Sequence, residues 1–165
     1  MKSKLLFLLL LAVLIISCDD DKPAAPSDDN AGKLYVKFIN EAASEYDISV
    51  IQIRALGLVT EGENPTGDWS ENLLRNGEVI KPGQYKYFYL DIPNRHWSKA
   101  RIGVYSSQGS TIMLHEQSGF NVAFPVTNIT HWGNDKRTVR AAVAYSSSEQ
   151  MILVQSWSDW AGIED

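Results

Sequence analysis

Alternation of apolar and polar residues dominates the chain from residue 33 to residue 165. A period of two is typical of β-strands, whose successive side chains point to opposite faces of a sheet. Turn-forming residues separate the alternating segments, which predicts an all-β fold, a single antiparallel β-sandwich of about eight strands. Strands are expected at 34–39, 48–53, 78–80, 85–91, 99–105, 111–116, 120–124, 139–145 and 150–157, with the last two forming a hairpin.

Two local patterns add detail to this picture. Lys81-Pro82-Gly83-Gln84 has proline in the second and glycine in the third position, as a type II turn requires. The long polar loop 60–71 leads into a short helical turn expected at 70–75, for which Ser70 is the candidate cap.

The first 18 residues show no such alternation and consist of a short basic segment followed by an apolar one. Lys2 and Lys4 precede the unbroken apolar segment Leu5 to Ile16. As a helix this segment would span about 18 Å, which is too short for a bilayer core of roughly 30 Å and suits the apolar part of a secretory signal. The segment ends in Ile15-Ile16-Ser17-Cys18, which resembles the lipobox of bacterial lipoproteins.

The lipobox resemblance implies that residues 1–17 are a signal peptide and that Cys18 becomes a lipid-bearing amino terminus. Diacylglycerol would be attached to the sulfur of Cys18, and a further acyl chain, such as palmitate, to the new amino group. Each buried CH₂ contributes about 0.8 kcal/mol, so several acyl chains on one residue anchor a protein almost permanently. The implied location is the bacterial cell envelope, at the outer membrane or cell surface in preference to the inner membrane. An uncleaved signal anchor with an incidental cysteine is the alternative.

Residues 18–32 are expected to form an acidic, disordered tether. The segment from Asp19 has five aspartates, two prolines and no large apolar residue, so it cannot bury enough surface to offset chain entropy. Fully extended, it reaches about 50 Å. Its acidic start resembles surface-export signals of lipoproteins in the Bacteroidota. An aspartate after the cysteine also marks inner-membrane retention in other bacteria, and a plain solvated spacer is the third possibility.

The charge balance argues against nucleic acid as a partner. The chain has 15 basic and 20 acidic residues, a net charge of −5, and residues 33–165 alone carry about −3. No basic stripe is present that could neutralise phosphates.

Asn40 ends the first predicted strand, and a Trp69-Ser70-Glu71-Asn72-Leu73-Leu74 run and an Ile80-Lys81-Pro82-Gly83 turn follow it. These features resemble an uncharacterised family of small β-sandwich domains in exported bacterial proteins, which has a Trp-Gly-x-Asn-Leu-Leu-type motif. Ser70 replaces the glycine of that motif. The resemblance covers about residues 36–105 and implies a fold but no activity. We expect Asn72 to satisfy backbone groups of the loop, and Trp69, Leu73 and Leu74 to fold the loop over an open end of the sandwich.

Catalytic and metal-binding motifs are absent from the sequence. His96, His115 and His131 form no H-x-x-x-H pair and Cys18 is the lone cysteine, so no zinc site is expected. The G-x-S-x-G, P-loop and G-x-G-x-x-G patterns are missing as well. We therefore predict no enzyme, no catalytic residue and no cofactor. A calcium site in the acidic loop is disfavoured against a solvated loop, because EF-hand spacing is absent; its acids are Glu61, Glu63, Asp68 and Glu71.

Tryptophans are the best candidates for a binding role, and we single out Trp157, Trp160 and Trp132. Such rings can stack on sugars or anchor protein interfaces, although they can also plug the ends of a core. The leading hypothesis is a membrane-anchored envelope lipoprotein whose non-catalytic sandwich binds a protein or glycan partner. The alternative is a small hydrolase, or an accessory subunit, acting on envelope polysaccharide. It requires a pocket that unites two carboxylates, or His115 or His131 with a carboxylate.

We predict that Cys18→Ala abolishes lipidation and leaves unprocessed precursor, because the acyl acceptor is lost. Metabolic labelling with a fatty acid and the electrophoretic mobility of the chain report both effects. A Cys18→Ala variant that is still processed and still bound to the membrane would contradict the lipoprotein interpretation.

Overall fold

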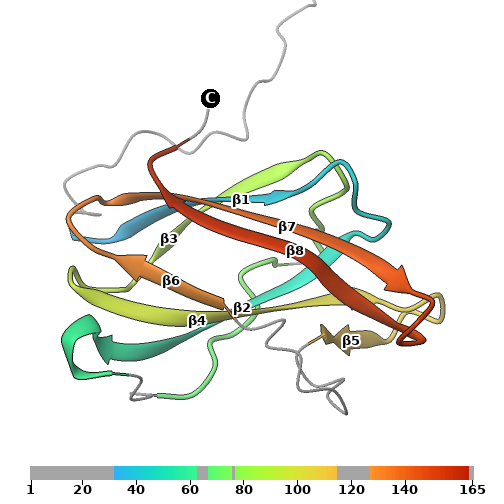
Figure 1. The fold of residues 1–165 in the computed structure, drawn as a ribbon, viewed down its shortest axis with the longest axis horizontal. Coiled ribbons are helices and arrows are strands. Elements are labelled where there is room, and N and C mark those ends of the chain that lie inside the picture. The colour runs from blue at the N-terminus through green and yellow to red at the C-terminus, as the bar shows by residue number, and fades with distance from the viewer. Residues whose placement is uncertain (1–31, 63–66, 76, 115–126, 164–165) are drawn as a thin grey trace, which may run out of the picture.

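The described chain folds into two β-sheets packed face to face (Figure 1). The structure is a computed structural model that describes residues 32–62, 67–75, 77–114 and 127–163. The predicted all-β sandwich is confirmed, whereas the expected signal peptide, Cys18 and tether lie outside the described residues. The elements are β1 (Leu34–Asn40), β2 (Ile48–Leu58), the 3₁₀ turn η2 (Val59–Glu61), β3 (Tyr85–Leu90), β4 (His96–Tyr105), β5 (Thr111–Met113), β6 (Thr127–His131), β7 (Lys136–Ser146) and β8 (Met151–Ala161).

Sheet A has the strand order β3-β1-β7-β8. Strand β1 pairs antiparallel with β3 and parallel with β7, so the predicted antiparallel sandwich contains one parallel pair. The pairing of β7 with β8 confirms the predicted hairpin, which has an irregularity between Ala142 and Val143. In Figure 1, β1, β3 and β7 form the upper layer and β8 crosses in front of it.

Sheet B has the order β2-β4-β5, and β6 also pairs with β4. Strand β6 was not predicted, because Ile129 is its single aliphatic residue. The predicted strand at 120–124 lies outside the described residues, and the one at 78–80 reduces to a bridge between Ile48 and Ile80. No helix among the described residues is long and apolar enough to cross a membrane.

Inward-facing side chains of both sheets form the core. Alternate residues of β1 point inward and meet residues of the opposite sheet. The aliphatic side chains from both sheets are almost completely buried, and they include Leu34, Val36, Phe38, Ile51, Ile102, Val104, Ile129, Val139 and Val143.

The free edge of β2 is covered by the segment where a helical turn was predicted, at 70–75. The backbone N–H of Ser70 donates to Ile53 O (2.8 Å), and the Ile53 N–H donates to the Ser70 hydroxyl (3.0 Å). The Leu73 N–H donates to Ile51 O (2.9 Å). The predicted helical turn is therefore wrong. The backbone groups of this segment form hydrogen bonds with β2 and not with one another, and they pair the edge of β2 that would otherwise lack partners.

Asn72 is the central link between this segment and β2. Its Oδ1 accepts from Ile51 N (2.9 Å) and Leu74 N (3.1 Å), and its Nδ2 donates to Ser49 O (3.0 Å). The expectation that Asn72 satisfies backbone groups is thus confirmed. Leu74 enters the core and Leu73 packs against it, so the segment closes the side of the sandwich along β2.

Asn40, the last residue of β1, links this strand to the segments around Tyr46 and Ile80. Its fully buried Nδ2 donates to Tyr46 O (2.9 Å) and Ile80 O (2.7 Å). The adjacent turn has Gly83 at φ 79° and a Gln84 N to Lys81 O bond of 2.9 Å, as expected of a type II turn.

We predict that Asn72→Ala lowers the free energy of unfolding by about 2–3 kcal/mol, because it removes three hydrogen bonds and leaves strand groups without partners. Urea unfolding followed by tryptophan fluorescence measures the change. Asn134→Ala is the control: it removes one exposed bond, from Lys136 N to Oδ1, and should cost less than about 1 kcal/mol. Equal losses for the two variants would refute the bracing role of Asn72.

Candidate functional site

The outer face of sheet A gathers aromatic and basic side chains. Residues that alternate with the core positions of β1 point outward, and the strand registers place their neighbours beside them. We call this surface the tyrosine face. It comprises Tyr85, Tyr87 and Tyr89 on β3, Tyr35, Lys37 and Ile39 on β1, Lys136, Thr138 and Arg140 on β7, and Trp160 on β8. Of these, Tyr35, Lys37 and Thr138 are buried by their neighbours.

Stacked rings build the β3 side of the tyrosine face. The Tyr35 ring lies parallel to Tyr87, with centroids 5.1 Å apart and an interplanar angle of 2°, and it lies 4.8 Å from Tyr89. Tyr85 meets Tyr87 edge to face at 5.4 Å. Cross-strand aromatic pairs of this kind each stabilise a sheet by about 0.2–1 kcal/mol.

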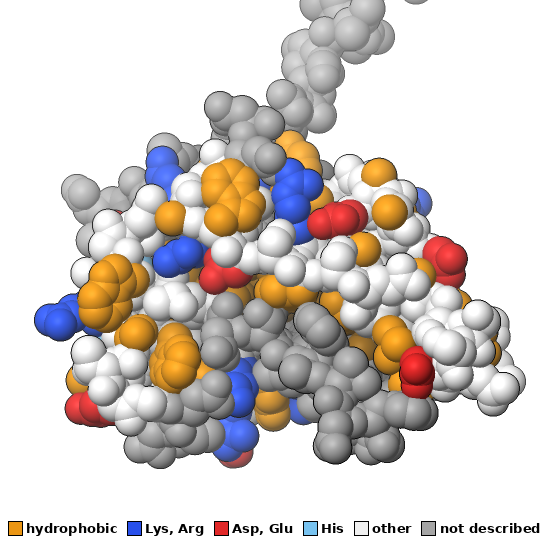
Figure 2. Space-filling model, viewed as in Figure 1, with side chains coloured by type: hydrophobic (Ala, Val, Ile, Leu, Met, Phe, Trp, Pro, Cys, Tyr) orange, Lys and Arg blue, Asp and Glu red, His pale blue; other side chains and the backbone are white. Residues whose placement is uncertain are grey.

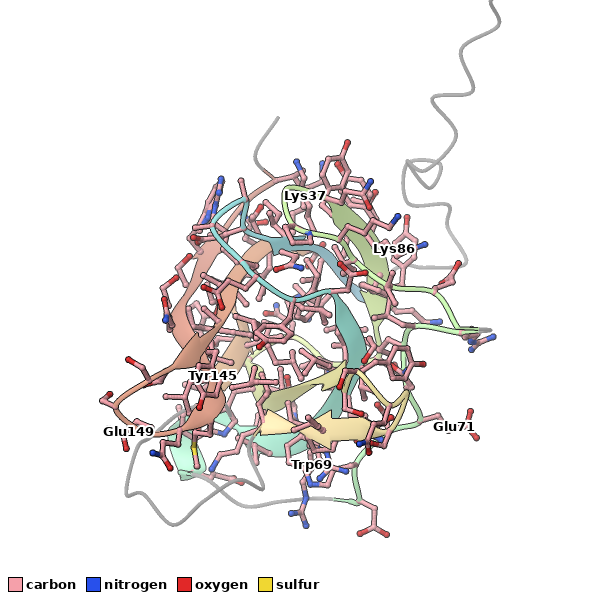
Figure 3. The ribbon with its side chains drawn as sticks, turned by 90° about the vertical axis from the view of Figure 1, so that its right-hand side faces the viewer. Lys37, Trp69, Glu71, Lys86, Tyr145 and Glu149 are labelled. Atoms are coloured by element: carbon pink, nitrogen blue, oxygen red, sulfur yellow. The ribbon has the colours of Figure 1, made fainter. Side chains whose placement is uncertain are left out.

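Lys37 lies at the centre of this face. Its Nζ lies 4.2 Å from the Tyr85 ring centroid and 5.9 Å from that of Tyr87. The residue is only 6% exposed, so its charge is partly desolvated and its attraction to the rings is strengthened. Figure 3 shows Lys37 above sheet A, on the side of the molecule opposite to Trp69.

The β7 and β8 side of the face is less aromatic and more basic. A continuous row crosses the sheet from Tyr87 through Lys37 and Thr138 to Trp160. Lys136 and Arg140 lie two residues either side of Thr138 on β7. Rings and cations are therefore neighbours on this face, which extends over four adjacent strands.

The three tryptophans selected from the sequence lie in different environments. Trp160 belongs to the tyrosine face. Trp157 packs against the core, with its ring 6.4 Å from that of Phe38, so the structure does not bring it to the same surface. Trp132 follows β6 and is 47% exposed, and Arg95 lies 5.4 Å from its ring. Sequence reasoning missed Tyr35, Lys37 and the three β3 tyrosines as candidates, although the Tyr-x-Tyr-x-Tyr alternation of β3 was the available signal.

His131 has a polar partner at each of its two ring nitrogens. His131 Nδ1 lies 2.5 Å from Ile92 O, and Nε2 lies 2.7 Å from Asp135 Oδ1. The ring is fully buried, which makes His131 a link between β6 and the loop after β3. His115 lies outside the described residues.

A cleft of about 380 Å³ opens between β2, the segment 67–73 and the end of β3. Aliphatic side chains form most of its wall, and its lining includes the carboxylates of Asp68 and Asp91. This is the arrangement that the hydrolase alternative requires. Both carboxylates are exposed, however, and within the described residues neither has a hydrogen-bonding partner that could orient it. Catalytic carboxylates are normally held by such partners.

Among the described acids, Asp159 has a shifted pKa. Burial raises the pKa of Asp159 above its usual value, although Arg137 and the backbone N–H of Thr130 act in the opposite direction. The nearest atoms of the Arg137–Asp159 pair are 3.8 Å apart, and each side chain is 13% exposed. The pair lies at the inner side of sheet A and provides no surface for a ligand.

Metal-binding geometry is not found in the part of the chain that the structure describes, where no group of three or more His, Cys, Asp or Glu could hold an ion.

Trp69 does not cover an end of the sandwich as expected. Its ring stacks 4.4 Å from the guanidinium of Arg101, a residue of β4, so it lies on the outer face of sheet B.

Comparison of the chain with protein-family models, curated proteins and solved structures found no match.

The Tyr35 phenol provides a test of the stacked face. Burial first, and then the charges of Tyr87 and Tyr89 when ionised, raise the pKa of Tyr35 from 10.0 to about 12. The folded state therefore keeps a proton that the unfolded state loses, and the stability from the neutral phenol is complete below pH 10 and is lost as the pH rises through about 12.

We predict that the wild-type chain loses more unfolding free energy between pH 10 and 12 than Tyr35→Phe does. Urea unfolding at a series of pH values measures the difference, and absorbance titration of the tyrosines should lose its last step in Tyr35→Phe. Tyr105→Phe, at a 42% exposed site, should follow the wild type. A Tyr35→Phe curve as steep as that of the wild type would contradict the assignment.

Proposed function

We propose that this protein is a lipoprotein of the bacterial cell envelope whose sandwich is a non-catalytic glycan-binding module. Residues 1–17 direct export, Cys18 carries the lipid anchor, residues 18–32 form the tether, and residues 33–165 form the binding domain. The anchor holds the domain at the outer membrane or cell surface. The lipobox-like segment and the acidic, proline-containing composition after Cys18 support this arrangement.

The observation that carries the binding function is the tyrosine face itself. Its side chains come from four adjacent strands, so their spacing is fixed by the sheet and no loop has to be ordered on binding. Flat rings with polar hydroxyl groups suit sugars, which present apolar C–H faces edged by hydroxyl groups. Tyr85 is 44% exposed and Tyr87, Tyr89 and Trp160 are partly exposed, so ring surface is available to a ligand.

The surface composition favours a glycan over a protein partner. The buried centre of a stable protein interface is more apolar than the rest of the protein surface. On the side of the molecule seen in Figure 2, the described hydrophobic side chains are interspersed with charged and polar ones. Among the described residues, the large hydrophobic side chains that are exposed are Tyr85, Tyr105, Trp132 and Tyr145. The three tyrosines can form hydrogen bonds with hydroxyl groups.

Glycan binding is also favoured over hydrolysis. The cleft beside Asp68 and Asp91 supplies two carboxylates, but none of the described contacts orients them. The tyrosine face, by contrast, is a rigid array whose rings pack on one another. Rigid arrays suit binding because little side-chain entropy is lost when the ligand arrives.

We predict that Tyr85→Ala and Trp160→Ala each weaken glycan binding about tenfold, since each removes a ring worth about 1.4 kcal/mol of contact. Full-length chain in detergent, first screened on a glycan array and then titrated by calorimetry with the best ligand, gives the values. Tyr105→Ala is a matched control, because Tyr105 is 42% exposed against 44% for Tyr85 but lies on the opposite sheet.

Unchanged binding in Tyr85→Ala and Trp160→Ala would move the site away from the tyrosine face. Absence of binding to any glycan would overturn the glycan proposal and make an envelope protein the leading partner.

A further inference from the structure

We propose that the ligand of the tyrosine face is an acidic glycan, a polysaccharide whose sugars carry carboxylate or sulfate groups. This inference rests on the proposed glycan-binding function and names the class of its ligand.

The distribution of charge in the domain is the first argument. Residues 33–165 contain more acids than bases. The outward positions of the four sheet A strands nevertheless include Lys37, Lys136 and Arg140 and no acid. Asp135, which directly precedes Lys136, directs its carboxylate to His131 at 2.7 Å. A face that is basic within an acidic domain is complementary to a negatively charged ligand.

The second argument is the placement of the cations among the rings. The Lys37 ammonium lies over the rings of Tyr85 and Tyr87, where its charge contributes to the positive potential of the face. Lys136 is exposed and Arg140 is half-buried on β7, four residues apart, which corresponds to about 13 Å along a strand. A guanidinium can bind a carboxylate through two parallel hydrogen bonds. The face can therefore hold sugar rings on its β3 side and anionic groups on its β7 side.

The third argument distinguishes a glycan from denser polyanions. The domain as a whole is negatively charged, so a ligand with closely spaced phosphates would be repelled beyond the local patch. An acidic polysaccharide carries one charge per sugar or per few sugars, separated by neutral hydroxyl groups. Sparse charges of this kind match cations that are spaced over two neighbouring strands beside the tyrosine rings, Lys37 on β1 and Lys136 and Arg140 on β7.

The test uses polygalacturonate, alginate and hyaluronate as acidic probes, and methyl-esterified polygalacturonate as the uncharged counterpart of the first. Full-length chain in detergent is titrated with each probe at 50 mM and 500 mM salt. We expect at least one acidic probe to bind, with at least tenfold weaker affinity after esterification or in high salt, because exposed charges are screened over about 10 Å at 0.1 M salt.

Charge-neutralising variants locate the effect. Lys136→Gln and Arg140→Gln should each weaken binding of the acidic probe at least fivefold. Lys99→Gln makes the same change in net charge on β4, in the opposite sheet, and should leave the affinity within twofold. Tyr85→Ala should weaken binding at both salt concentrations.

Each contrary outcome is informative. Equal binding of neutral and acidic glycans would overturn the acidic-ligand inference and leave the glycan-binding function intact. Binding of none of the glycans, acidic or neutral, would overturn both. Equal weakening by Lys99→Gln would show that net charge and not the tyrosine face is responsible, and equally tight binding of polyglutamate would replace the glycan by an acidic protein segment.

Discussion

The position of β1 between β3 and β7 is the constraint on which both the core and the candidate site depend. Alternate residues of β1 contribute Leu34, Val36 and Phe38 to the core and Tyr35 and Lys37 to the tyrosine face. A register shift of one residue would exchange the two sets and place a lysine in the core. The register is therefore fixed by burial, and the geometry of the outer face follows from it. The parallel pairing of β1 with β7 joins segments about a hundred residues apart in the chain, so neither face exists until distant parts of the chain have met.

Closure of the β2 edge is the second requirement of this fold, and it explains why the motif residues are present. Asn72 and Ser70 bond to β2, Leu74 fills the core, and Pro82 and Gly83 shape the turn before β3. All of these roles are structural. Residues with a binding role then have to be sought on surfaces that the motif does not touch.

Strands whose apolar and polar residues alternate clearly could be predicted from the sequence. Segments whose local structure depends on contacts with distant parts of the chain could not. β1, β3 and the β7–β8 hairpin could be predicted because their apolar positions alternate over several residues. β6 was missed because the burial of Ile129 and His131 arises from pairing with β4, which a sequence of mostly polar residues does not reveal. The segment 70–75 was mistaken for a helical turn because its hydrogen bonds go to a strand that is distant in the sequence.

The candidate site, too, could be predicted from the sequence only in part. Trp157 and Trp160 are three residues apart, and an odd separation on one strand directs two side chains to opposite faces. Their different environments could therefore have been predicted once residues 150–161 were taken as a strand, whereas the sequence left the last tryptophan in a polar tail. The tyrosine face could not be assembled in this way, because its members come from strands whose order in the sheet differs from their order in the sequence.

The proposed anchor and the proposed binding surface are connected through the same strand. The segment that we propose as the tether enters the fold at Leu34, beside Tyr35 at the end of the tyrosine face. A tether able to reach about 50 Å at full extension allows the face to turn away from the bilayer and toward extended polymers of the envelope. Acidic residues in the proposed tether and in the domain repel anionic ligands, except at the cations of the tyrosine face. Attraction confined to one rigid surface within a repulsive surrounding favours selectivity over strength. This suits the anchor that we propose, because the lipid and not the ligand would then hold the protein in place.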